Sequence, residues 1–267
     1  MKKLGIISGS GDLPFLLAKS VADHGMEPIV VQVTQEMSPE LGKIVNHIHP
    51  IGIGQIRKII KLFLDSGVDE VAIIGKIEKS ILLNPLQLDT AAIRILSSLP
   101  NKGDRTIMTA AINYFEGKGI KIIDQTLYLK NLLPPTGVLT KRKPTGTQWK
   151  DIKYGIELAR QVASIDIGQT VVVKNMIPIA IEAIEGTDST IERGGALGGK
   201  GIVVAKATSS DHDFRVDVPT VGERTLKLLH QANGSVLAVE AGRTFLLRGH
   251  QLSQIADQLK ISLVAVN

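Results

Sequence analysis

Short apolar runs alternate with amphipathic stretches through the first half of the chain. The runs have the length and the branched aliphatic content of buried strands, and the stretches repeat apolar residues at helical spacing. We expect strands at 3–7, 28–33, 68–77 and 120–124. We expect helices at 13–24, 56–64, 84–98 and 104–116. The third helix is predicted to begin at Asn84 and Pro85, because an N-cap residue precedes a proline suited to the first turn. Alternating strands and helices predict a Rossmann-like doubly wound parallel sheet.

Proline and glycine interrupt this alternation in the middle of the chain. Residues 131–148 contain three prolines and two glycines, and they have turn character rather than core character. We therefore expect a Rossmann-like nucleotide-binding domain over residues 1–131, a linker over 132–147 and a second domain over 148–267.

The second half also mixes strands and helices, but it does not repeat the order of the first. Helices are expected at 149–163, 189–193, 221–232 and 251–259. Strands are expected at 169–173, 178–184, 201–206, 235–241 and 261–266. The tight connection between the first two of these strands favours an antiparallel hairpin. The second domain is thus predicted to be α/β with a mixed sheet.

The composition excludes several classes of protein. The 267 residues contain no cysteine, which excludes disulfides, thiolate metal sites and a cysteine nucleophile. The net charge of +5 is modest and aromatic residues make up only 3% of the chain, which argues against a nucleic-acid partner. The chain shows no signal peptide and no apolar run of the ~18 residues that a membrane-spanning helix needs. We expect a cytoplasmic protein that at most rests on a membrane surface.

The sequence SGSGDLP, residues 8–14, follows the first expected strand and opens the first helix. Gly9 and Gly11 match two glycines of the dinucleotide-binding fingerprint, but Pro14 stands where the third would be. The acidic residue expected to bind a ribose would be Glu36, which lies beyond the second strand. These departures argue against NAD. Amides at a helix N-terminus attract anions, so a phosphate or a nucleotide is expected here; a plain strand-to-helix turn is the alternative.

The stretch EAIEGTDSTIERGG, residues 182–195, places carboxylates beside a cation at the end of an expected strand. It holds Glu185, Asp188 and Arg193, and its Ser189 and Glu192 have the spacing of a capping box.

The stretch DHDFRVDVPTVGERT, residues 211–225, has the same character. Alternation along an extended backbone would place Arg215 and Asp217 on one side, and Lys206 ends the strand before them. Carboxylates that share a site with cations can hold Mg²⁺ and polarise a phosphate, which indicates hydrolysis or phosphotransfer. For any single residue, a solvated cap or a surface ion pair is the alternative.

Six motifs along essentially the whole chain together resemble one known family. They are GSGDLP, GKIEK, PPTGVLTKRKPT, DIGQTVVV, EAIEGTDSTIERGG and DFRVDVPTVGERT. In this order they resemble the UDP-2,3-diacylglucosamine pyrophosphatases of lipid A biosynthesis of the LpxI type. One departure is visible: Gly103-Asp104-Arg105 stands where the family has a glycine followed by two acidic residues.

The resemblance implies hydrolysis of UDP-2,3-diacylglucosamine to UMP and 2,3-diacylglucosamine 1-phosphate (lipid X), with Mg²⁺ as cofactor and the substrate between two domains. Asp217 falls on the aspartate of the family's RxDxP motif and is expected to activate or orient water or to bind the metal. Asp188 and Glu185 are supporting catalytic candidates, and Asp188 is the second candidate metal ligand. The candidate substrate-binding residues are Gly9, Gly11, Asp12, Gly75, Lys76, Thr187, Arg193, Lys206, Arg215, Thr220 and Gly222.

A lipid-linked substrate further implies transient contact with the inner membrane surface, and a homo-oligomer is left open. Two other functions compete with this interpretation. A nicotinamide-dependent oxidoreductase would need an acidic ribose partner after the second strand. A non-catalytic nucleotide-sugar or lipid-binding protein of Rossmann-like fold would use the same cleft without cleaving the substrate.

Overall fold

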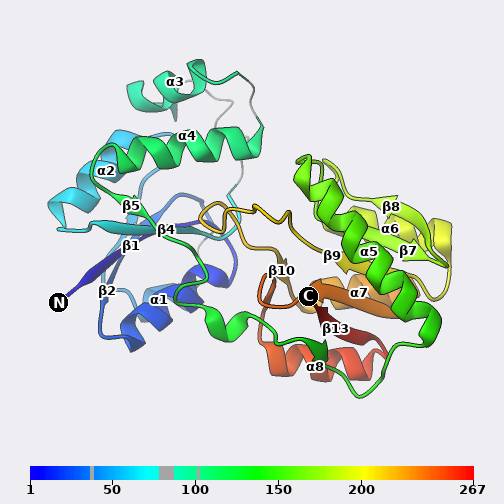
Figure 1. Cartoon of the computed structure of the whole chain (residues 1–267). Helices are drawn as coiled ribbons and strands as arrows, with labels where there is room; N and C mark the ends of the chain where they lie inside the picture. Colours follow the sequence, from blue (N-terminus) through cyan, green and yellow to red (C-terminus); the bar gives the residue numbers. More distant parts are fainter. Residues whose placement is uncertain (37–38, 78–86, 101–102) are drawn as a thin grey trace. The chain divides into compact units, whose positions relative to one another are not determined.

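The computed structural model describes residues 1–36, 39–77, 87–100 and 103–267 and divides them into two compact units (Figure 1). Unit 1 consists of Met1–Leu129 and Asp213–Asp217, and unit 2 consists of Lys130–His212 and Val218–Asn267. The second half of the sequence therefore contributes five residues to unit 1. The expected division at residues 131 and 148 did not include this return of the chain to the first unit.

Unit 1 is built on a parallel sheet in the order β3-β2-β1-β4-β5. Its strands are β1 (Lys3–Ser8), β2 (Glu27–Gln32), β3 (Ile48–Pro50), β4 (Glu70–Ile74) and β5 (Lys121–Ile122). The strand order reverses between β1 and β4, and the carboxyl ends at such a reversal are where α/β sheets bind ligands. The predicted Rossmann-like sheet is confirmed.

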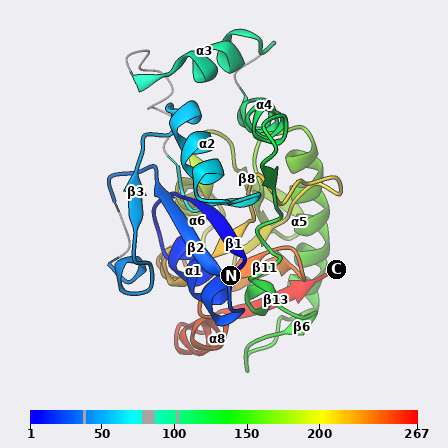
Figure 2. The same ribbon diagram turned by 90° about the vertical axis from the view of Figure 1, so that its left-hand side faces the viewer.

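Helices cover both faces of this sheet, as the doubly wound prediction requires. They are α1 (Leu13–Asp23), α2 (Ile56–Asp65), α3 (Thr90–Ser97) and α4 (Asp104–Glu116), with a 3-10 turn η1 (Leu41–Lys43) after β2. Helix α1 lies on one face, α2 and α4 lie on the other, and α3 lies outside them (Figures 1 and 2). The core between α2, α4 and the sheet is aliphatic apart from two phenylalanines, Phe63 and Phe115.

Helix α3 begins later than its sequence predicted. The expected start at Asn84 and Pro85 lies outside the described residues, and the helix begins at Thr90 after the N-cap Asp89. The Asp89 carboxylate accepts hydrogen bonds from the backbone N–H groups of Ala91 and Ala92, and also from that of Arg57 at 2.6 Å. One carboxylate therefore satisfies N–H groups at the start of α2 and α3, a longer-range cap that no local pattern signals.

Unit 2 is built on a mixed sheet in the order β6-β13-β11-β9-β7-β8. Its strands are β6 (Gly137–Val138), β7 (Thr170–Lys174), β8 (Ile177–Ile181), β9 (Val203–Lys206), β11 (Val236–Glu240) and β13 (Ser262–Val266). The strands β9, β11 and β13 are parallel to one another, and β7 and β8 form the predicted antiparallel hairpin. The pair β10 (Thr220–Val221) and β12 (Phe245–Leu246) stands apart as a second, two-stranded sheet.

The helices of unit 2 are α5 (Gly146–Ser164), α6 (Gly186–Gly198), α7 (Glu223–Gln231) and α8 (Gly249–Gln258), and a 3-10 turn η4 (Lys130–Leu132) precedes β6. One buried cluster joins α5 to the sheet, and another joins α6, α7 and α8 to the sheet. Within the segment expected as a linker, β6 pairs with β13 and Thr145 forms a capping box with Gln148 at the start of α5. Among the described residues, no helix is long and apolar enough to cross a bilayer.

Candidate functional site

The loop after β1 is joined to the loop after β4 at the point where the strand order of unit 1 reverses. The Gly9 N–H donates to the Ile74 carbonyl at 2.8 Å, and the Ser10 and Lys76 backbones exchange hydrogen bonds at 2.9 and 3.0 Å. A Cβ atom on Gly9 would lie 2.5 Å from the Lys76 carbonyl oxygen. The structure thus gives Gly9 a packing role, and the predicted role of this loop in binding a nucleotide stays a prediction.

Pro14 takes part in the same loop contact. A Cβ atom on Gly75 would lie 2.9 Å from Pro14 Cγ, and Gly75 has a φ of +93° that other residues rarely adopt. Gly11, with a φ of +97°, is exposed and has nothing within 4 Å of the position of a Cβ atom. The helix α1 starts after Asp12, whose side chain does not cap it. The predicted residues Gly9, Gly11, Asp12, Gly75 and Lys76 therefore lie in two adjoining loops.

The end of β2 carries a buried glutamine where dinucleotide-binding folds carry an acid. The Ser8 hydroxyl donates to the Gln32 side chain at 3.1 Å, and the Gln32 amide donates to Thr34 Oγ1 at 2.7 Å and to the Glu36 carbonyl at 3.0 Å. The amide of Gln32 is committed to holding the following loop. This arrangement agrees with the sequence argument against NAD.

The segment Asp213–Asp217 carries two of the predicted residues and packs within unit 1. The Phe214 carbonyl accepts from the Gln125 N–H at 3.2 Å, and Val216 packs against the core of unit 1. Phe214–Val216 forms a turn, closed by a hydrogen bond of 3.0 Å from the Val216 N–H to the Asp213 carbonyl. The expected extended backbone, with Arg215 and Asp217 on one side, is therefore wrong.

Arg215 is held by two carboxylates. Its guanidinium bonds Asp213 at 2.7 Å through Nη2 and Glu116 at 3.0 Å through Nη1. Hydrogen bonding and the charge of Asp213, with a further contribution from Glu116, raise the pKa of Arg215, so it stays fully charged. Asp217 is exposed, and it takes part in interactions with its surroundings. The segment thus holds an exposed carboxylate, Asp217, two residues after a cation that is held by two other carboxylates.

In unit 2, Lys206 ends β9 as a buried cation beside two threonines. Its ammonium donates to Thr187 Oγ1 at 2.9 Å and approaches Thr170 Oγ1 at 3.4 Å. Thr187 in turn donates to Glu182 Oε1 at 2.9 Å. The side chain of Lys206 is therefore linked to a carboxylate through one hydroxyl, and the predicted residues Lys206 and Thr187 are brought together.

The other acids of this stretch are paired with arginines. Glu185 binds Arg193, and Asp188 binds Arg224 at 2.8 Å. The backbone N–H of Glu185 itself and then Arg193 lower the pKa of the Glu185 carboxyl. Helix α6 starts at Gly186, so Ser189 lies inside the helix and the expected capping box at Ser189 is wrong.

The remaining predicted residues lie where the chain returns to unit 2. The Thr220 hydroxyl donates to the Val218 carbonyl at 2.9 Å, and Gly222 is the N-cap residue of α7. Asp217 belongs to unit 1, whereas Asp188 and Glu185 belong to unit 2. Within the described residues, no group of three or more histidines and acids has the geometry of a metal site.

The sequence analysis missed a buried charged cluster at the carboxyl ends of β9 and β11. Glu240, only 2% exposed, accepts from Arg160 at 2.7 Å, from the Thr208 N–H at 2.7 Å and from the Thr208 hydroxyl at 3.0 Å. Arg243 donates to Thr208 Oγ1 at 3.0 Å and to the Ser209 carbonyl at 2.7 Å. The one available signal was a carboxylate, Glu240, directly after the apolar run 236–239.

The fold and these clusters define an α/β protein whose first unit has the strand order of a Rossmann-like sheet. Family models extend this description. The LpxI N-terminal domain matches residues 3–132, and the LpxI C-terminal domain matches residues 135–264. The chain belongs to the LpxI family, which confirms the resemblance seen in its motifs.

One relative matches along the full length. The UDP-2,3-diacylglucosamine pyrophosphatase LpxI of Caulobacter vibrioides is 30% identical over 278 aligned positions, covering 100% of this chain and 98% of the relative. Solved structures match weakly. A biotin carboxylase domain of a 2-oxoglutarate carboxylase has a TM-score of 0.29 at 13% identity, covering 64% of this chain and 35% of its own. An N5-carboxyaminoimidazole ribonucleotide synthetase also scores 0.29, at 15% identity, covering 73% and 45%. Both scores are too low to support an argument.

Proposed function

We propose that this protein hydrolyses the pyrophosphate bond of UDP-2,3-diacylglucosamine, giving UMP and 2,3-diacylglucosamine 1-phosphate, as a step of lipid A biosynthesis. The observation that carries the proposal is the family match over both domains, together with the relative named for this activity over its whole length. The protein would thus be a hydrolase.

The two glycine loops of unit 1 are the proposed site for the nucleotide. They lie at the carboxyl ends of β1 and β4, and Gly11 leaves the start of α1 without an overhanging side chain. The first N–H groups of a helix lack partners within the helix, and together with the helix dipole they favour a phosphate. The Asp12 side chain forms no capping hydrogen bond at this helix end.

Asp217 is the proposed residue that orients or deprotonates the attacking water. A diphosphate repels an incoming nucleophile, so cations must neutralise its oxygens while a carboxylate directs the water. Arg215, whose charge is fixed by Asp213 and Glu116, is the proposed cation next to it. In unit 2, Lys206 and Arg193 are the proposed cations for the substrate.

Mg²⁺ is the proposed cofactor. In phosphate chemistry this ion is commonly held by one or two carboxylates and the substrate oxygens, so a preformed cage of three acids is not required. The proposed ligands are the carboxylate of Asp217, which is exposed, and that of Asp188, which binds Arg224 at 2.8 Å. When bound, the ion would neutralise charge on the diphosphate.

Nucleotide release tests the proposal directly. We expect the purified protein to release UMP from UDP-2,3-diacylglucosamine but not from an ordinary UDP-sugar, and EDTA to abolish the release. Asp217→Asn should lower kcat by about 10²-fold or more, because a positioned acid or base contributes that much. Asp69→Asn, a change of an exposed aspartate in the same unit, is the matched control and should keep the activity.

A non-catalytic nucleotide-sugar or lipid-binding protein is the alternative function. It predicts that the substrate binds to the wild-type protein but that no UMP appears with any divalent cation. Retained binding with lost release in Asp217→Asn would instead support catalysis. A cytoplasmic location, transient contact with the inner membrane and a homo-oligomer remain expectations that follow from the substrate and the family.

A further inference from the structure

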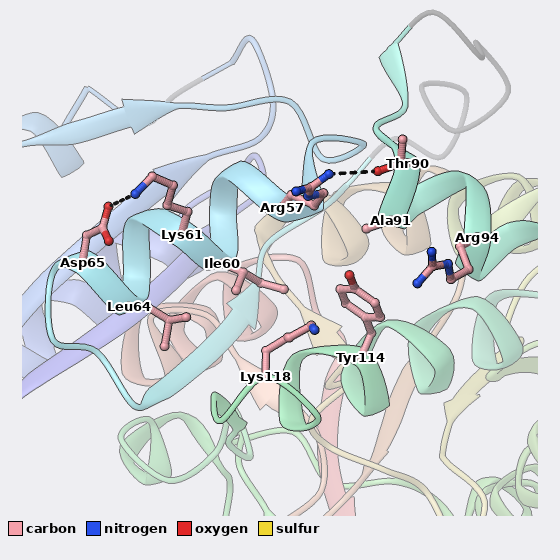
Figure 3. Close-up of a pocket in the computed structure, with 10 residues that line it drawn as sticks. All are labelled: Arg57, Ile60, Lys61, Leu64, Asp65, Thr90, Ala91, Arg94, Tyr114 and Lys118. Atoms are coloured by element: carbon pink, nitrogen blue, oxygen red, sulfur yellow. Dashed lines mark hydrogen bonds and ion pairs between the residues drawn. The ribbon is translucent and has the colours of Figure 1, made fainter.

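A cavity of about 480 Å³ lies in unit 1, between α2, α3 and the end of α4 (Figure 3). Its volume is within the usual range for small-molecule sites. None of the residues predicted for the pyrophosphatase site lines it. The lining residues are Arg57, Ile60, Lys61, Leu64, Asp65, Thr90, Ala91, Arg94, Tyr114 and Lys118.

The lining is strongly basic. The lining contains four cationic side chains and one carboxylate, Asp65, which is paired with Lys61 at 2.8 Å. Among the described residues, the Arg57 guanidinium donates a hydrogen bond to the hydroxyl of Thr90, at 3.3 Å, and forms no ion pair. The pocket therefore carries an excess of positive charge that its own side chains do not neutralise.

Two of the cations are available to a ligand. Within the described part of the chain, neither Arg94 nor Lys118 forms an ion pair or a side-chain hydrogen bond. Lys118 lies 5.7 Å from the centre of the Tyr114 ring, and Arg94 extends toward the same ring (Figure 3). A guanidinium, an ammonium and a phenol thus line one pocket together with the buried side chains of Ile60 and Ala91.

The pocket is separate from the proposed reaction site. Tyr114 lies in the last turn of α4, and Lys118 lies in the turn that follows the helix, where its backbone N–H donates to the Phe115 carbonyl at 2.9 Å. Glu116 lies between them in sequence and binds Arg215 of the segment Asp213–Asp217. Changes at Arg94 and Lys118 can therefore be made without touching the residues assigned to hydrolysis.

We propose that this basic pocket binds a phosphate-type anion, supplied either by the headgroup of an anionic lipid or by a soluble phosphate compound. Guanidinium and ammonium groups suit phosphate oxygens, because they offer several donors and remain charged at neutral pH. The rim adds apolar surface, because Leu64 lines the pocket and is 48% exposed. This inference does not rest on the proposed hydrolysis.

Binding measurements with the full-length protein test it. The probes are inorganic phosphate, followed by calorimetry, and phosphatidylcholine vesicles with and without phosphatidylglycerol, followed by cosedimentation. The pocket variant is Arg94→Gln combined with Lys118→Gln. The matched control is Lys150→Gln combined with Lys153→Gln, which removes two exposed cations of unit 2.

We expect wild-type protein to bind one of these probes, and the binding to weaken as salt is raised. A cation near an anionic surface contributes about fivefold to binding, so the pocket variant should bind at least about tenfold more weakly. The control variant should bind like wild type. Binding of phosphatidylglycerol vesicles without binding of phosphate assigns the site to a headgroup, and binding of phosphate assigns it to a soluble compound. Equal loss in both variants, equal retention in both, or no binding of either probe by wild-type protein overturns the proposal.

Discussion

Gly9 has no room for a side chain, because the backbone of the adjoining loop fills the space. A Cβ atom there would lie 2.5 Å from the Lys76 oxygen and 2.8 Å from the Gly75 carbonyl carbon. Backbone atoms cannot swing aside as the end of a side chain can. We therefore expect Gly9→Ala to lower the free energy of unfolding by about 1–3 kcal/mol, measured by urea denaturation.

Gly52→Ala is the control for this change. Gly52 also has an ordinary φ, but nothing lies within 4 Å of a Cβ atom built on it, so its substitution should leave the unfolding midpoint nearly unchanged. Unchanged stability in Gly9→Ala, together with a raised KM for the lipid substrate, would contradict the packing role. It would assign Gly9 to the ligand alone.

The carboxyl of Glu185 makes the stability of unit 2 depend on pH. Its pKa is lowered from the ordinary 4.5 by its own backbone N–H and then by Arg193. A carboxyl with a lowered pKa in the folded state stabilises the fold while it is ionised, and this contribution is lost as the pH falls below about 4.5. Glu185→Gln should therefore lower Tm at neutral pH, and its difference from wild type should shrink in acid.

Melting curves across the acidic and neutral range measure this difference. Glu192→Gln is the control, because Glu192 is exposed on the same helix and forms no ion pair within the described residues. Its Tm should follow that of wild type at every pH. A Tm difference for Glu185→Gln that stays constant down to the lowest pH would contradict the assignment.

At the level of elements, residues 240–247 of unit 2 contact the chain both before and after the segment Asp213–Asp217. Before that segment, Glu240 and Arg243 form hydrogen bonds with Thr208 and Ser209 in the buried charged cluster. After it, the Pro219 carbonyl accepts from the Phe245 N–H at 2.8 Å, and β10 pairs with β12. Residues 240–247 thus fix where the chain leaves and re-enters the unit.

Loss of charge at Glu240 should loosen this arrangement. Hydrogen bonds to a charged group are worth more than neutral ones, so Glu240→Gln should lower the free energy of unfolding by about 2–3 kcal/mol. It should also lower kcat for UMP release at a temperature where the variant is still folded. Glu223→Gln, at an exposed pair with Lys227, is the control and should change neither quantity noticeably. Full activity in folded Glu240→Gln would show that the cluster serves stability alone.

The elements themselves were predictable because their signals are local. The helix α4 has the bounds 104–116 expected from its apolar spacing, and the β7–β8 hairpin follows from a short connection. Two predictions failed for one physical reason, namely the start of α3 and the extended backbone around Arg215. Asp89 caps α3 while also serving α2, and the turn at Phe214–Val216 is set by Arg215 bonding Asp213 and Glu116. Contacts between residues far apart in sequence decide both cases, and no local pattern contains them.

At the level of the whole molecule, the division into two units also depends on contacts between residues far apart in sequence. The turn-rich composition around 131–148 is the basis of the expected domain boundary, and the two family models end and begin at 132 and 135. The motif RVDVP lies far beyond this point, yet its first three residues group with unit 1. Val216 packs against the core of that unit, so the motif is divided between the units by burial and not by chain order.

We expect the ion pair between Glu116 and Arg215 to affect catalysis, because it holds the segment of unit 1 that carries Asp217. Both side chains are more than a third exposed, so the pair should contribute less than about 1 kcal/mol to stability. If Glu116 acts by holding Arg215 in place, Glu116→Gln should lower kcat for UMP release in the wild-type background. It should have no further effect when Arg215 is already glutamine.

A double-mutant cycle of Glu116→Gln and Arg215→Gln measures this coupling from kcat and from urea denaturation in parallel. The exposed pair of Lys227 and Glu223 in unit 2 provides the control cycle, in which neither change should alter kcat. Because a purely structural role would appear equally in stability and in kcat, strong coupling in kcat with weak coupling in stability identifies Glu116 as a positioning residue. Fully additive effects on kcat would instead mean that Glu116 has no part in holding the segment that carries Asp217.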